Sequence, residues 1–538
     1  MRKKMLSILT ISLLLTGCQS DINTTETIVI DRELNLSGEN PISFPLDEPL
    51  ELTFHYHASN QYAFNESWPV FKEMEQLTNI SFKNTANTFS TQTATEMQLQ
   101  TASQFPSDLY GGSNISNYFM TYGPDGAFYS LDDYWEYLPN FSQYLSENPD
   151  VIASITSPDG KIYHLPSLTD GGVSRAYFIR EDWLDNLGLD MPETVEEFEN
   201  TLIAFKNDDP NGNGIKDEIP YFNDNWLEMI RLVNLWDARC YSSDNYDDRF
   251  VRDEYGVWYH TWTTDEFKEG IKNISRWYDL GLIDRQIFTI ETSARLEYLI
   301  GDLGGMTHEW VSSTSTYNNN SYVDNFKFSV VSPPITANGN QWEEHVRTKV
   351  TDDGVAISTS CDEEIVPLLF AYLDYFWSEE GRILANYGVE DEHWTYIDGF
   401  PTFKEEIVDD SPSVYTYLRE NVGAQLNFGF VQDYNYELQW THPLGIEGAY
   451  MYTQNGYSDN LFTLPNLPYT SDELYYLDTL LYGIHGYQNE QIVTFILEDW
   501  TLIDSAWDKY VEKSELLGVP DLLNLVDTVY TRYISYQY

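Results

Sequence analysis

The chain has 538 residues, 42% of them hydrophobic, which is too long for one ordinary core, so we expect two or more globular lobes. Its 86 acidic and 29 basic residues give a formal net charge of −57, which argues against nucleic acid or an anionic membrane surface as a partner unless a cleft is locally basic. Three cysteines are too few for a disulfide-stapled scaffold.

Residues 1–17 are typical of a signal peptide, with a basic start followed by an apolar run too short to span a bilayer. The sequence Leu-Thr-Gly-Cys that ends at Cys18 resembles a bacterial lipobox, in which the cysteine receives fatty acyl chains such as palmitate. The alternative is an ordinary signal peptide with a chance cysteine. The lipobox predicts a protein anchored by lipid to the extracellular face of the cytoplasmic membrane, with no transmembrane helix. Residues 18–45 are polar and predict a linker.

A βαβ-type lobe is predicted next. Apolar residues alternate with polar ones over 50–56, as in a half-buried strand, and helical spacing follows over 68–77. A short strand over 108–110 then enters a turn at Gly111-Gly112. Strand, helix and strand in this order indicate an α/β arrangement.

Further turns, strands and helices follow along the chain. The pattern predicts a turn at 159–166, a strand over 177–180, a helix over 181–187 closed by Gly188, and helical runs over 363–386 and from Ser471 to the end. Two helices are expected to begin with capping boxes, Thr194 with Glu197 and Thr263 with Glu266, the second helix being closed by Gly281.

The most informative stretch is 209–220 (DPNGNGIKDEIP), which we name the calcium loop. Oxygen-bearing side chains alternate at Asp209, Asn211 and Asn213, glycine follows at 214, and the Ile215 carbonyl supplies a further oxygen. Because Pro220 occupies the position of the usual bidentate ligand, we assign that role to Glu218, with Asp217 beside it. The alternative is a polar Asn-Gly turn without metal. No catalytic group flanks the loop, so Ca²⁺ here would be structural.

Aromatic residues near loops are candidate platforms for sugar rings, which present flat C–H faces and a rim of hydroxyls. The candidates are Trp68, Tyr110, Trp226, Trp236, Trp310 and Trp440, with Asp108, Asn225 and Glu309 as polar partners. For each aromatic the alternative is core packing, which we expect for Trp277, Trp377 and Trp500 on helical apolar stripes.

Taken together, these segments resemble a family 1 extracellular solute-binding protein, the lipoprotein receptor of a carbohydrate ABC importer. The segments that carry the resemblance are DGKIYHLP at 159–166, YFIREDWLDNLGLDMPETVEEF at 177–198, the calcium loop, and NYGVEDEHWTYIDGFP at 386–401.

The resemblance implies a two-lobed periplasmic-binding-protein-like fold of type II, with discontinuous lobes and a largely helical C-terminal region. We place one lobe at 46–165 and 330–400 and the other at 166–329 and 401–538. In the oligosaccharide- and alginate-binding subgroup, the positions matching Asp209, Asn211, Asn213, Ile215, Asp217 and Glu218 hold a structural Ca²⁺.

The function expected from the resemblance is capture of an oligosaccharide between the lobes and its delivery to the permease subunits of an ABC importer, by a monomer that catalyses no reaction. A surface-anchored glycoside hydrolase, which needs two carboxylates across a cleft, and a lipoprotein that feeds a sensor kinase are the alternatives. The acidic composition argues against polyuronates as ligands, although Arg175, Arg231, Arg239 and Arg347 could form a basic cleft.

Overall fold

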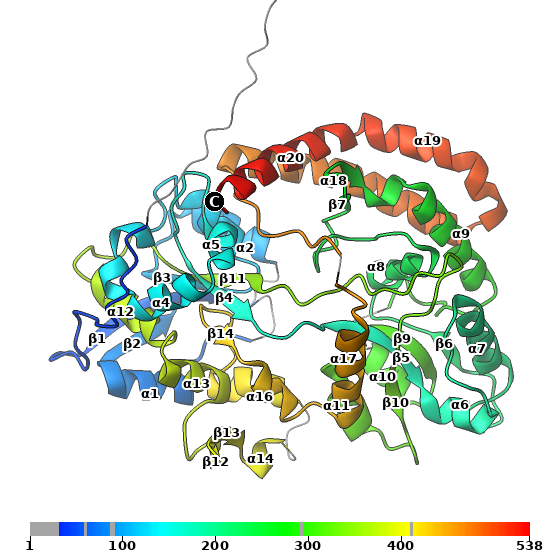
Figure 1. Ribbon diagram of the computed structural model, residues 1–538, viewed down its shortest axis with the longest axis horizontal. Helices are drawn as coiled ribbons and strands as arrows, with labels where there is room; N and C mark the ends of the chain where they lie inside the picture. Colours follow the sequence, from blue (N-terminus) through cyan, green and yellow to red (C-terminus); the bar gives the residue numbers. More distant parts are fainter. Residues whose placement is uncertain are drawn as a thin grey trace, which may run out of the picture.

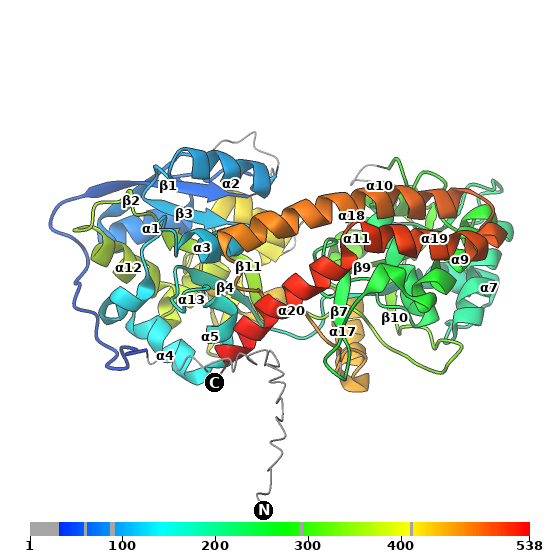
Figure 2. The same ribbon diagram turned by 90° about the horizontal axis from the view of Figure 1, so that it is seen from above.

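The computed structural model describes residues 32–58, 62–86, 92–290, 294–408, 413–459 and 461–537. They form two α/β lobes with a set of long C-terminal helices that runs from one lobe to the other (Figures 1 and 2). The predicted signal peptide and Cys18 lie outside the described residues. Among those described, no helix is long and apolar enough to cross a bilayer.

The second half of the predicted linker is not a free spacer. The Arg32 side chain forms an ion pair of 3.0 Å with Asp132 and donates a hydrogen bond of 2.6 Å to the Gly160 carbonyl. Asn40 donates from its side chain to the Tyr137 carbonyl at 2.9 Å. Residues 32–45 therefore lie against the first lobe instead of separating it from a membrane.

The first lobe, the N-lobe, contains a six-stranded sheet in the order β14-β4-β11-β3-β1-β2. Strands β2, β1 and β3 are parallel, and β11 is antiparallel to both β3 and β4. The predicted strand at 50–56 and helix at 68–77 are confirmed as β1 and α1. The strands are β1 (Leu50–His57), β2 (Ile80–Asn84), β3 (Leu109–Gly112), β4 (Leu165–Thr169), β11 (Val350–Ile357) and β14 (Val431–Gln432).

Helices cover this sheet, and a two-stranded hairpin projects beside them (Figure 1). The helices are α1 (Pro69–Thr78), α2 (Thr93–Ala102), α3 (Ser116–Tyr122), α4 (Pro139–Glu147), α5 (Asp150–Ile155), α12 (Val366–Tyr375), α13 (Glu379–Tyr387), α14 (Glu405–Val408), α15 (Val414–Tyr417) and α16 (Tyr434–Leu438), and the hairpin is β12 (Trp394–Ile397) with β13 (Phe400–Phe403). The single helical run predicted at 363–386 is wrong, because Ser378 caps the start of α13 by accepting from the Gly381 N–H and separates α13 from α12.

The second lobe, the C-lobe, contains a four-stranded sheet in the order β10-β5-β9-β6. Its strands are β5 (Arg175–Arg180), β6 (Ile219–Tyr221), β9 (Gly304–Trp310) and β10 (Phe328–Val331), with the separate hairpin β7 (Phe250–Arg252) and β8 (Trp258–His260). Its helices are α6 (Glu181–Leu187), α7 (Val195–Asn207), α8 (Trp226–Met229), α9 (Asp265–Asp279), α10 (Ala294–Ile300), α11 (Ser313–Asn320) and α17 (Pro443–Asn455), and a 3₁₀ helix spans Ile230–Trp236.

Local signals predicted these helix ends well. The helix at 181–187 ends at Gly188, and the capping box of Thr194 with Glu197 is present at the start of α7. The second capping box is wrong by one residue, because Thr264 caps α9 by accepting from the Phe267 N–H. The Thr263 hydroxyl instead donates to the His260 carbonyl at 2.9 Å.

The boundary between the lobes differs from the prediction. Buried residues of 394–408 and 413–436, such as Phe403, Leu418 and Phe430, pack in the N-lobe core, and β14 pairs with β4 in the N-lobe sheet, whereas the sequence predicts 401–538 in the other lobe. The chain crosses between the sheets in three segments, at 170–174, 332–349 and 439–442. A strand of two residues such as β14 carries no recognisable periodicity, so its pairing could not be read from the sequence.

Three C-terminal helices, α18 (Ser471–Leu497), α19 (Ile503–Leu516) and α20 (Val519–Ser535), confirm the helical region predicted from Ser471. The end of α18 packs in the C-lobe core, whereas α20 and the start of α18 form a smaller core with Ala153 of the N-lobe and Trp258 of the C-lobe. Hydrogen bonds join this region to the N-lobe, from the Thr121 hydroxyl to the Tyr469 carbonyl and from the Tyr536 hydroxyl to the Pro158 carbonyl. The helices therefore contact both lobes (Figure 2).

Candidate functional site

The candidate site is the lobe junction, which we define as the strand ends that adjoin the crossing segments: the start of β5 and end of β9 in the C-lobe, and the end of β3 and start of β11 in the N-lobe. The first two crossing segments pair with each other through a bridge between Val173 and Val346. Arg347, in the second segment, donates to the Asp170 carbonyl of the first segment at 3.1 Å. It also forms two bonds of 2.9 and 2.8 Å with the carboxylate of Glu437, which lies in α16 just before the third segment. Its guanidinium also lies 5.3 Å from the Tyr434 ring centroid.

On the C-lobe side, an aromatic ring stands open at the strand ends. Arg175 and Trp310 are cross-strand partners at the start of β5 and the end of β9. The Arg175 guanidinium lies 4.2 Å from the Trp310 ring centroid, a cation–π arrangement that covers part of the ring. Trp310 is 38% exposed, which makes it the most exposed tryptophan of the described residues. Its ring is therefore available for stacking.

A network of buried charged side chains holds Arg175 in position beside the Trp310 ring. Glu228 accepts from the Arg175 guanidinium at 2.8 Å and from Arg231 at 3.2 Å. His308 lies between Glu228 and Glu343, with N···O distances of 3.2 and 3.1 Å. Burial opposes ionisation of Glu228, but the positive charges of Arg175, Arg231 and His308 outweigh it and hold the pKa of this carboxyl well below its usual value. Glu228 is thus ionised and holds Arg175 in place.

On the N-lobe side, polar groups gather where β3 ends and β11 begins. Gly112 has φ +135°, and a Cβ there would lie 1.8 Å from the His57 carbonyl oxygen, so only glycine permits this turn. Asp353 accepts from the Asn114 N–H at 2.9 Å, and Asp352 accepts from the Ser116 hydroxyl at 2.5 Å. Asn114 and Ser116 follow the carboxyl end of the parallel strand β3, the usual position for a ligand in an α/β sheet, whereas Asp352 and Asp353 lie in the neighbouring antiparallel strand β11.

Carboxylates from the two lobes approach each other across the junction. Desolvation raises the pKa of Asp248 in the C-lobe to about 7, and the carboxylates of Asp247 and of Asp352, which belongs to the N-lobe, raise it further while a hydrogen bond from Ser243 lowers it. Desolvation likewise raises the pKa of Asp352 to about 6, with a contribution from Asp353. Both side chains are only partly buried. The junction thus combines an open aromatic ring with hydrogen-bonding carboxylates.

The structure places some of the predicted ligand residues elsewhere. Trp68 is 2% exposed within the N-lobe core, where its indole N–H donates to the Glu420 carbonyl at 2.7 Å. Tyr110 is completely buried, and Asp108 is used to accept from the Thr53 N–H and hydroxyl at 2.8 and 2.6 Å. These three residues support the sheet and present no ring face or free carboxylate to a sugar.

The remaining candidates lie in the C-lobe or at its border. Glu309 is buried in an ion pair with Arg295 and accepts from the Trp310 N–H at 2.7 Å, so it supports the platform. Asn225 caps α8 by accepting from the Glu228 N–H. Trp226, Trp236 and Trp440 are partly buried, with ring centroids 6.3 Å from Trp262, 5.1 Å from Trp277 and 6.0 Å from Tyr436, respectively. Of the predicted aromatics, Trp310 is the one whose ring stands open.

Sequence reasoning missed Glu228, Asp244, His308, Asp352 and Asp353 at the junction. Their carboxylates and imidazole come from separate loops and strands that meet only in the folded chain. With 86 acidic residues in the sequence, no local pattern marks these few.

The calcium loop lies at one end of α7 and is folded around its own acidic side chains. Asp209 accepts from the Gly214 N–H at 3.0 Å, and Gly214 has φ +78°, as the sharp turn requires. The Asp209 Oδ1 atom and both carboxylate oxygens of Glu218 are buried and lack a hydrogen-bond partner. Desolvation, with the negative charges of Asp217 and Asp209, raises the pKa of Glu218. Buried carboxylate oxygens without donors fit a hard cation.

Side chains of His, Cys, Asp and Glu alone would not complete such a site. Within the described ranges, no three of these side chains are grouped closely enough to hold a metal ion, so Asp209, Asp217 and Glu218 do not form such a group in this structure. The predicted set also uses the amide oxygens of Asn211 and Asn213 and the carbonyl oxygen of Ile215, and oxygen donors of these kinds suit Ca²⁺. The loop is tied to the C-lobe sheet because Asn211 donates from its side chain to the carbonyl of Asp302, close to the start of β9.

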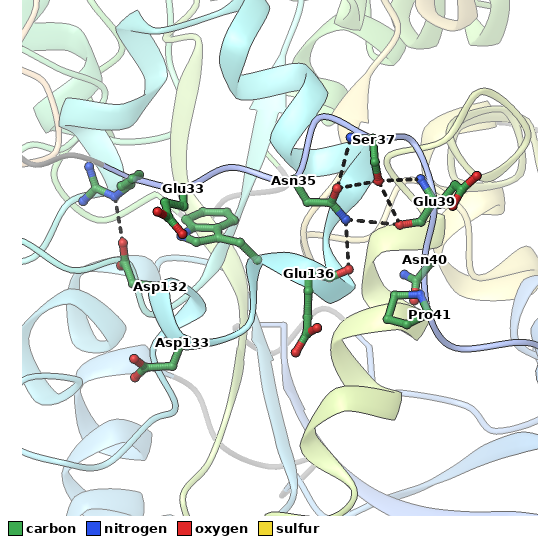
Figure 3. Close-up of a pocket in the computed structure, with 11 residues that line it drawn as sticks. Glu33, Asn35, Ser37, Glu39, Asn40, Pro41, Asp132, Asp133 and Glu136 are labelled. Carbon is green, nitrogen blue, oxygen red and sulfur yellow. Dashed lines mark hydrogen bonds and ion pairs between the residues drawn. The ribbon is translucent and has the colours of Figure 1, made fainter.

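A pocket of about 750 Å³ lies on the N-lobe, between residues 32–41 and the segment 132–136 (Figure 3). Glu33, Glu39, Asp132, Asp133 and Glu136 line it and make it strongly acidic. None of the predicted ligand residues lies in it, and its walls come from the N-lobe alone. We therefore place the candidate site at the lobe junction and not in this pocket.

Comparison with known proteins identifies the family. No protein-family model matches the chain. The fructooligosaccharide ABC transporter substrate-binding protein FusA of Streptococcus pneumoniae is 26% identical over 448 residues, which cover 79% of each protein. The crystal structure of alginate-binding protein AlgQ2 aligns with 92% of this chain and 100% of its own, at 34% identity and a TM-score of 0.80. The chain belongs to the substrate-binding proteins of ABC transporters.

This family confirms the predicted two-lobed fold and the prediction of a binding protein in place of an enzyme. Lipoprotein LipO of Bacillus subtilis is another relative, 24% identical over 284 residues, which cover 51% of this chain and 55% of LipO. The AlgQ2 structure is that of the protein without calcium ion, and a FusA structure, of similar fold at 21% identity, is that of an EF-hand mutant with fructo-nystose.

Proposed function

We propose that this protein captures an oligosaccharide at the lobe junction and delivers it to the permease subunits of an ABC importer. The observation that carries the proposal is the open ring of Trp310 at the border of the lobes, held by Arg175 over a buried charge network. Its relatives include proteins named for binding alginate and fructooligosaccharide. A sugar ring would stack on Trp310, and its hydroxyls would donate to carboxylates such as Asp244 and Asp352.

Binding would act through closure of the lobes. A ligand that contacts both lobes stabilises the closed arrangement relative to the open one by the difference between its two affinities. The crossing segments meet at Arg347, so we place the hinge there. The permease would then recognise the surface around the closed junction.

We also propose that the calcium loop holds a structural Ca²⁺ with Asp209, Asn211, Asn213, Asp217 and Glu218 and the Ile215 carbonyl. The buried, unpartnered carboxylate oxygens of Asp209 and Glu218 support this assignment. Bound Ca²⁺ would neutralise the crowded carboxylates and fix the connection between α7 and β6. The ion would stabilise the C-lobe without touching the ligand.

The N-terminus would be lipid-anchored through Cys18 on the extracellular face of the cytoplasmic membrane, as proposed from the lipobox. The relative LipO, a lipoprotein, supports this proposal. In a bacterial host, the wild-type chain should fractionate with membranes and incorporate labelled palmitate, whereas Cys18→Ser should do neither. A Cys18→Ser chain that stays in the membrane fraction would contradict the anchor.

Isothermal titration calorimetry with an oligosaccharide panel tests the ligand proposal. We expect stoichiometric binding of at least one oligosaccharide without release of shorter products, and a smaller radius of gyration by X-ray scattering once the sugar is bound. Turnover of the sugar by catalytic amounts of protein, or no binding throughout a broad panel, would contradict the proposed function.

A further inference from the structure

The arginines near the lobe junction bear on the charge of the ligand. A binding site for uronate sugars needs a guanidinium or ammonium group that is free to pair with the carboxylate of the sugar. The sequence offers four candidates for this role, Arg175, Arg231, Arg239 and Arg347. The structure shows what each of them contacts.

Carboxylates of this chain already pair with all four. Arg175 contacts Glu228 at 2.8 Å and Asp244 at 3.7 Å. Arg231 contacts Glu228 at 3.2 Å and Glu344 at 3.5 Å, and Arg239 contacts Glu344 at 3.2 Å. Arg347 is held by both oxygens of Glu437.

These pairs are buried, so a sugar carboxylate could not simply replace them. The side chains of Glu228, Arg231 and Glu344 are each no more than 2% exposed. Taking an arginine from such a pair would leave a buried carboxylate without its partner, which is strongly unfavourable. An acidic sugar would therefore gain little from these arginines.

One further arginine near the junction, Arg419, is also engaged by groups of the protein itself. Arg419 donates to the Gln425 carbonyl at 2.8 Å, contacts Asn427, and lies 4.2 Å from the Tyr415 ring centroid. It makes no ion pair within 4.0 Å in the described part of the chain, but its charge acts on Asp353 nearby. With Asp352 next to Asp353, this side of the junction carries more carboxylates than cations.

The carboxylates that remain accessible point to the same conclusion. The Asp244 side chain is 41% exposed beside Arg175, and Asp248, Asp352 and Asp353 are partly exposed. In their ionised form these groups accept hydrogen bonds from neutral hydroxyls but repel a carboxylate or sulfate. The formal charge of −57 adds to the repulsion.

We propose that the ligand is a non-acidic oligosaccharide, and that chains of uronate or sulfated sugars are excluded, even though a 34%-identical relative is an alginate-binding protein. This inference rests on the proposed function. The sequence alone leaves open that the four arginines form a basic cleft, and their ion pairs in the structure argue against it.

A glycan array with neutral and acidic glycans, followed by calorimetry on matched pairs, tests the inference. The pairs differ only at C6, for example β-1,4-mannotetraose against the tetramer of mannuronate. We expect the hits to be non-acidic and the acidic member of the pair to bind at least about a hundredfold more weakly in low salt. Raising the salt concentration should narrow this difference by screening the repulsion.

Removal of one carboxylate provides a second readout. Asp244→Asn should raise the ratio of uronate to neutral affinity by about fivefold, because one repulsive charge at the junction is lost. Asp504→Asn is the matched control, since it removes an exposed carboxylate on α19 and should leave the ratio unchanged. Uronate binding as tight as neutral binding would overturn the inference and leave the proposed function intact. The absence of binding by any glycan would contradict both the inference and the proposed function.

Discussion

At the scale of single residues, the pairing of Trp310 with Arg175 is the feature most directly tied to ligand binding. We expect Trp310→Ala to weaken oligosaccharide binding by about tenfold or more, because loss of a stacked ring costs about 1–2 kcal/mol. Calorimetry at constant Ca²⁺ measures the change. Trp500→Ala, on the partly buried 3₁₀ turn before α19, is the control and should bind normally. If Trp310→Ala binds the oligosaccharide as tightly as Trp500→Ala does, Trp310 is not part of the binding site.

His308 gives the molecule a pH-dependent contribution to stability. Burial lowers its pKa, but Glu343 and Glu228 outweigh burial, and the pKa of His308 lies above its ordinary value of 6.5. A raised folded-state pKa means that protonated His308 stabilises the fold below pH 6.5, and that this stability is lost as the pH rises through the folded pKa. We expect His308→Gln to melt at a lower temperature than wild type near pH ~5.5, with the gap narrowing at higher pH. Melting curves of both proteins from below pH 6.5 upward measure this difference in melting temperature. A difference that does not change with pH would contradict the raised pKa of His308.

Single residues were also where sequence reasoning reached its limit. Trp310 belongs to the predicted aromatic platforms near loops, and its side chain is 38% exposed. Trp68 also lay beside a predicted loop, yet its ring is covered partly by segment 420–423, some 350 positions away in the chain. Burial by distant segments leaves no mark on the local sequence, so the core and site roles of an aromatic could not be separated beforehand.

At the scale of elements, the calcium loop makes the sharpest prediction. Glu218→Gln removes the carboxylate assigned as the main ligand, so the melting temperature with excess Ca²⁺ should fall by several degrees and lose its response to a chelator. Saturation at a hundred times the dissociation constant would stabilise the folded state by about 2.7 kcal/mol. Differential scanning calorimetry measures this stability.

The matched control is Glu196→Gln, at an exposed position in the first turn of α7. It should keep the full response to Ca²⁺ and chelator. A wild-type melting temperature that is the same in Ca²⁺ and in chelator would show that the loop is a polar turn and not a metal site.

Elements with local signals were predicted most reliably. The capping box at Thr194 and the glycine at 188 act within a few residues of each helix end, and both are in place. The break between α12 and α13 was missed because the apolar pattern continues across it while the Ser378 cap interrupts the helix. The pairing of β14 with β4 depends on residues about 260 positions apart, so the sequence alone did not predict it.

At the scale of the whole molecule, the resemblance supplied the two lobes, and the structure changed how the C-terminal helices relate to them. The region beyond Ser471 was assigned to one lobe, but α18 and α20 pack against both. Closure must therefore move at least one lobe relative to these helices, or carry the helices with it. The helical region adds a second connection between the lobes beside the three crossing segments.

The crossing segments give the last prediction, because they meet at Arg347. Arg347→Ala would leave Glu437 without its partner and free the segment at 170–174, so the relative position of the lobes should become less restricted. We expect about threefold to tenfold weaker oligosaccharide binding and a larger radius of gyration without ligand, because fewer molecules occupy the binding-competent arrangement. Arg276→Ala removes a similar two-point pair with Glu199 inside the C-lobe and should change neither quantity. Calorimetry measures the affinity of both variants, and X-ray scattering measures their radius of gyration. If Arg347→Ala and Arg276→Ala agree in both quantities, the hinge does not lie at Arg347.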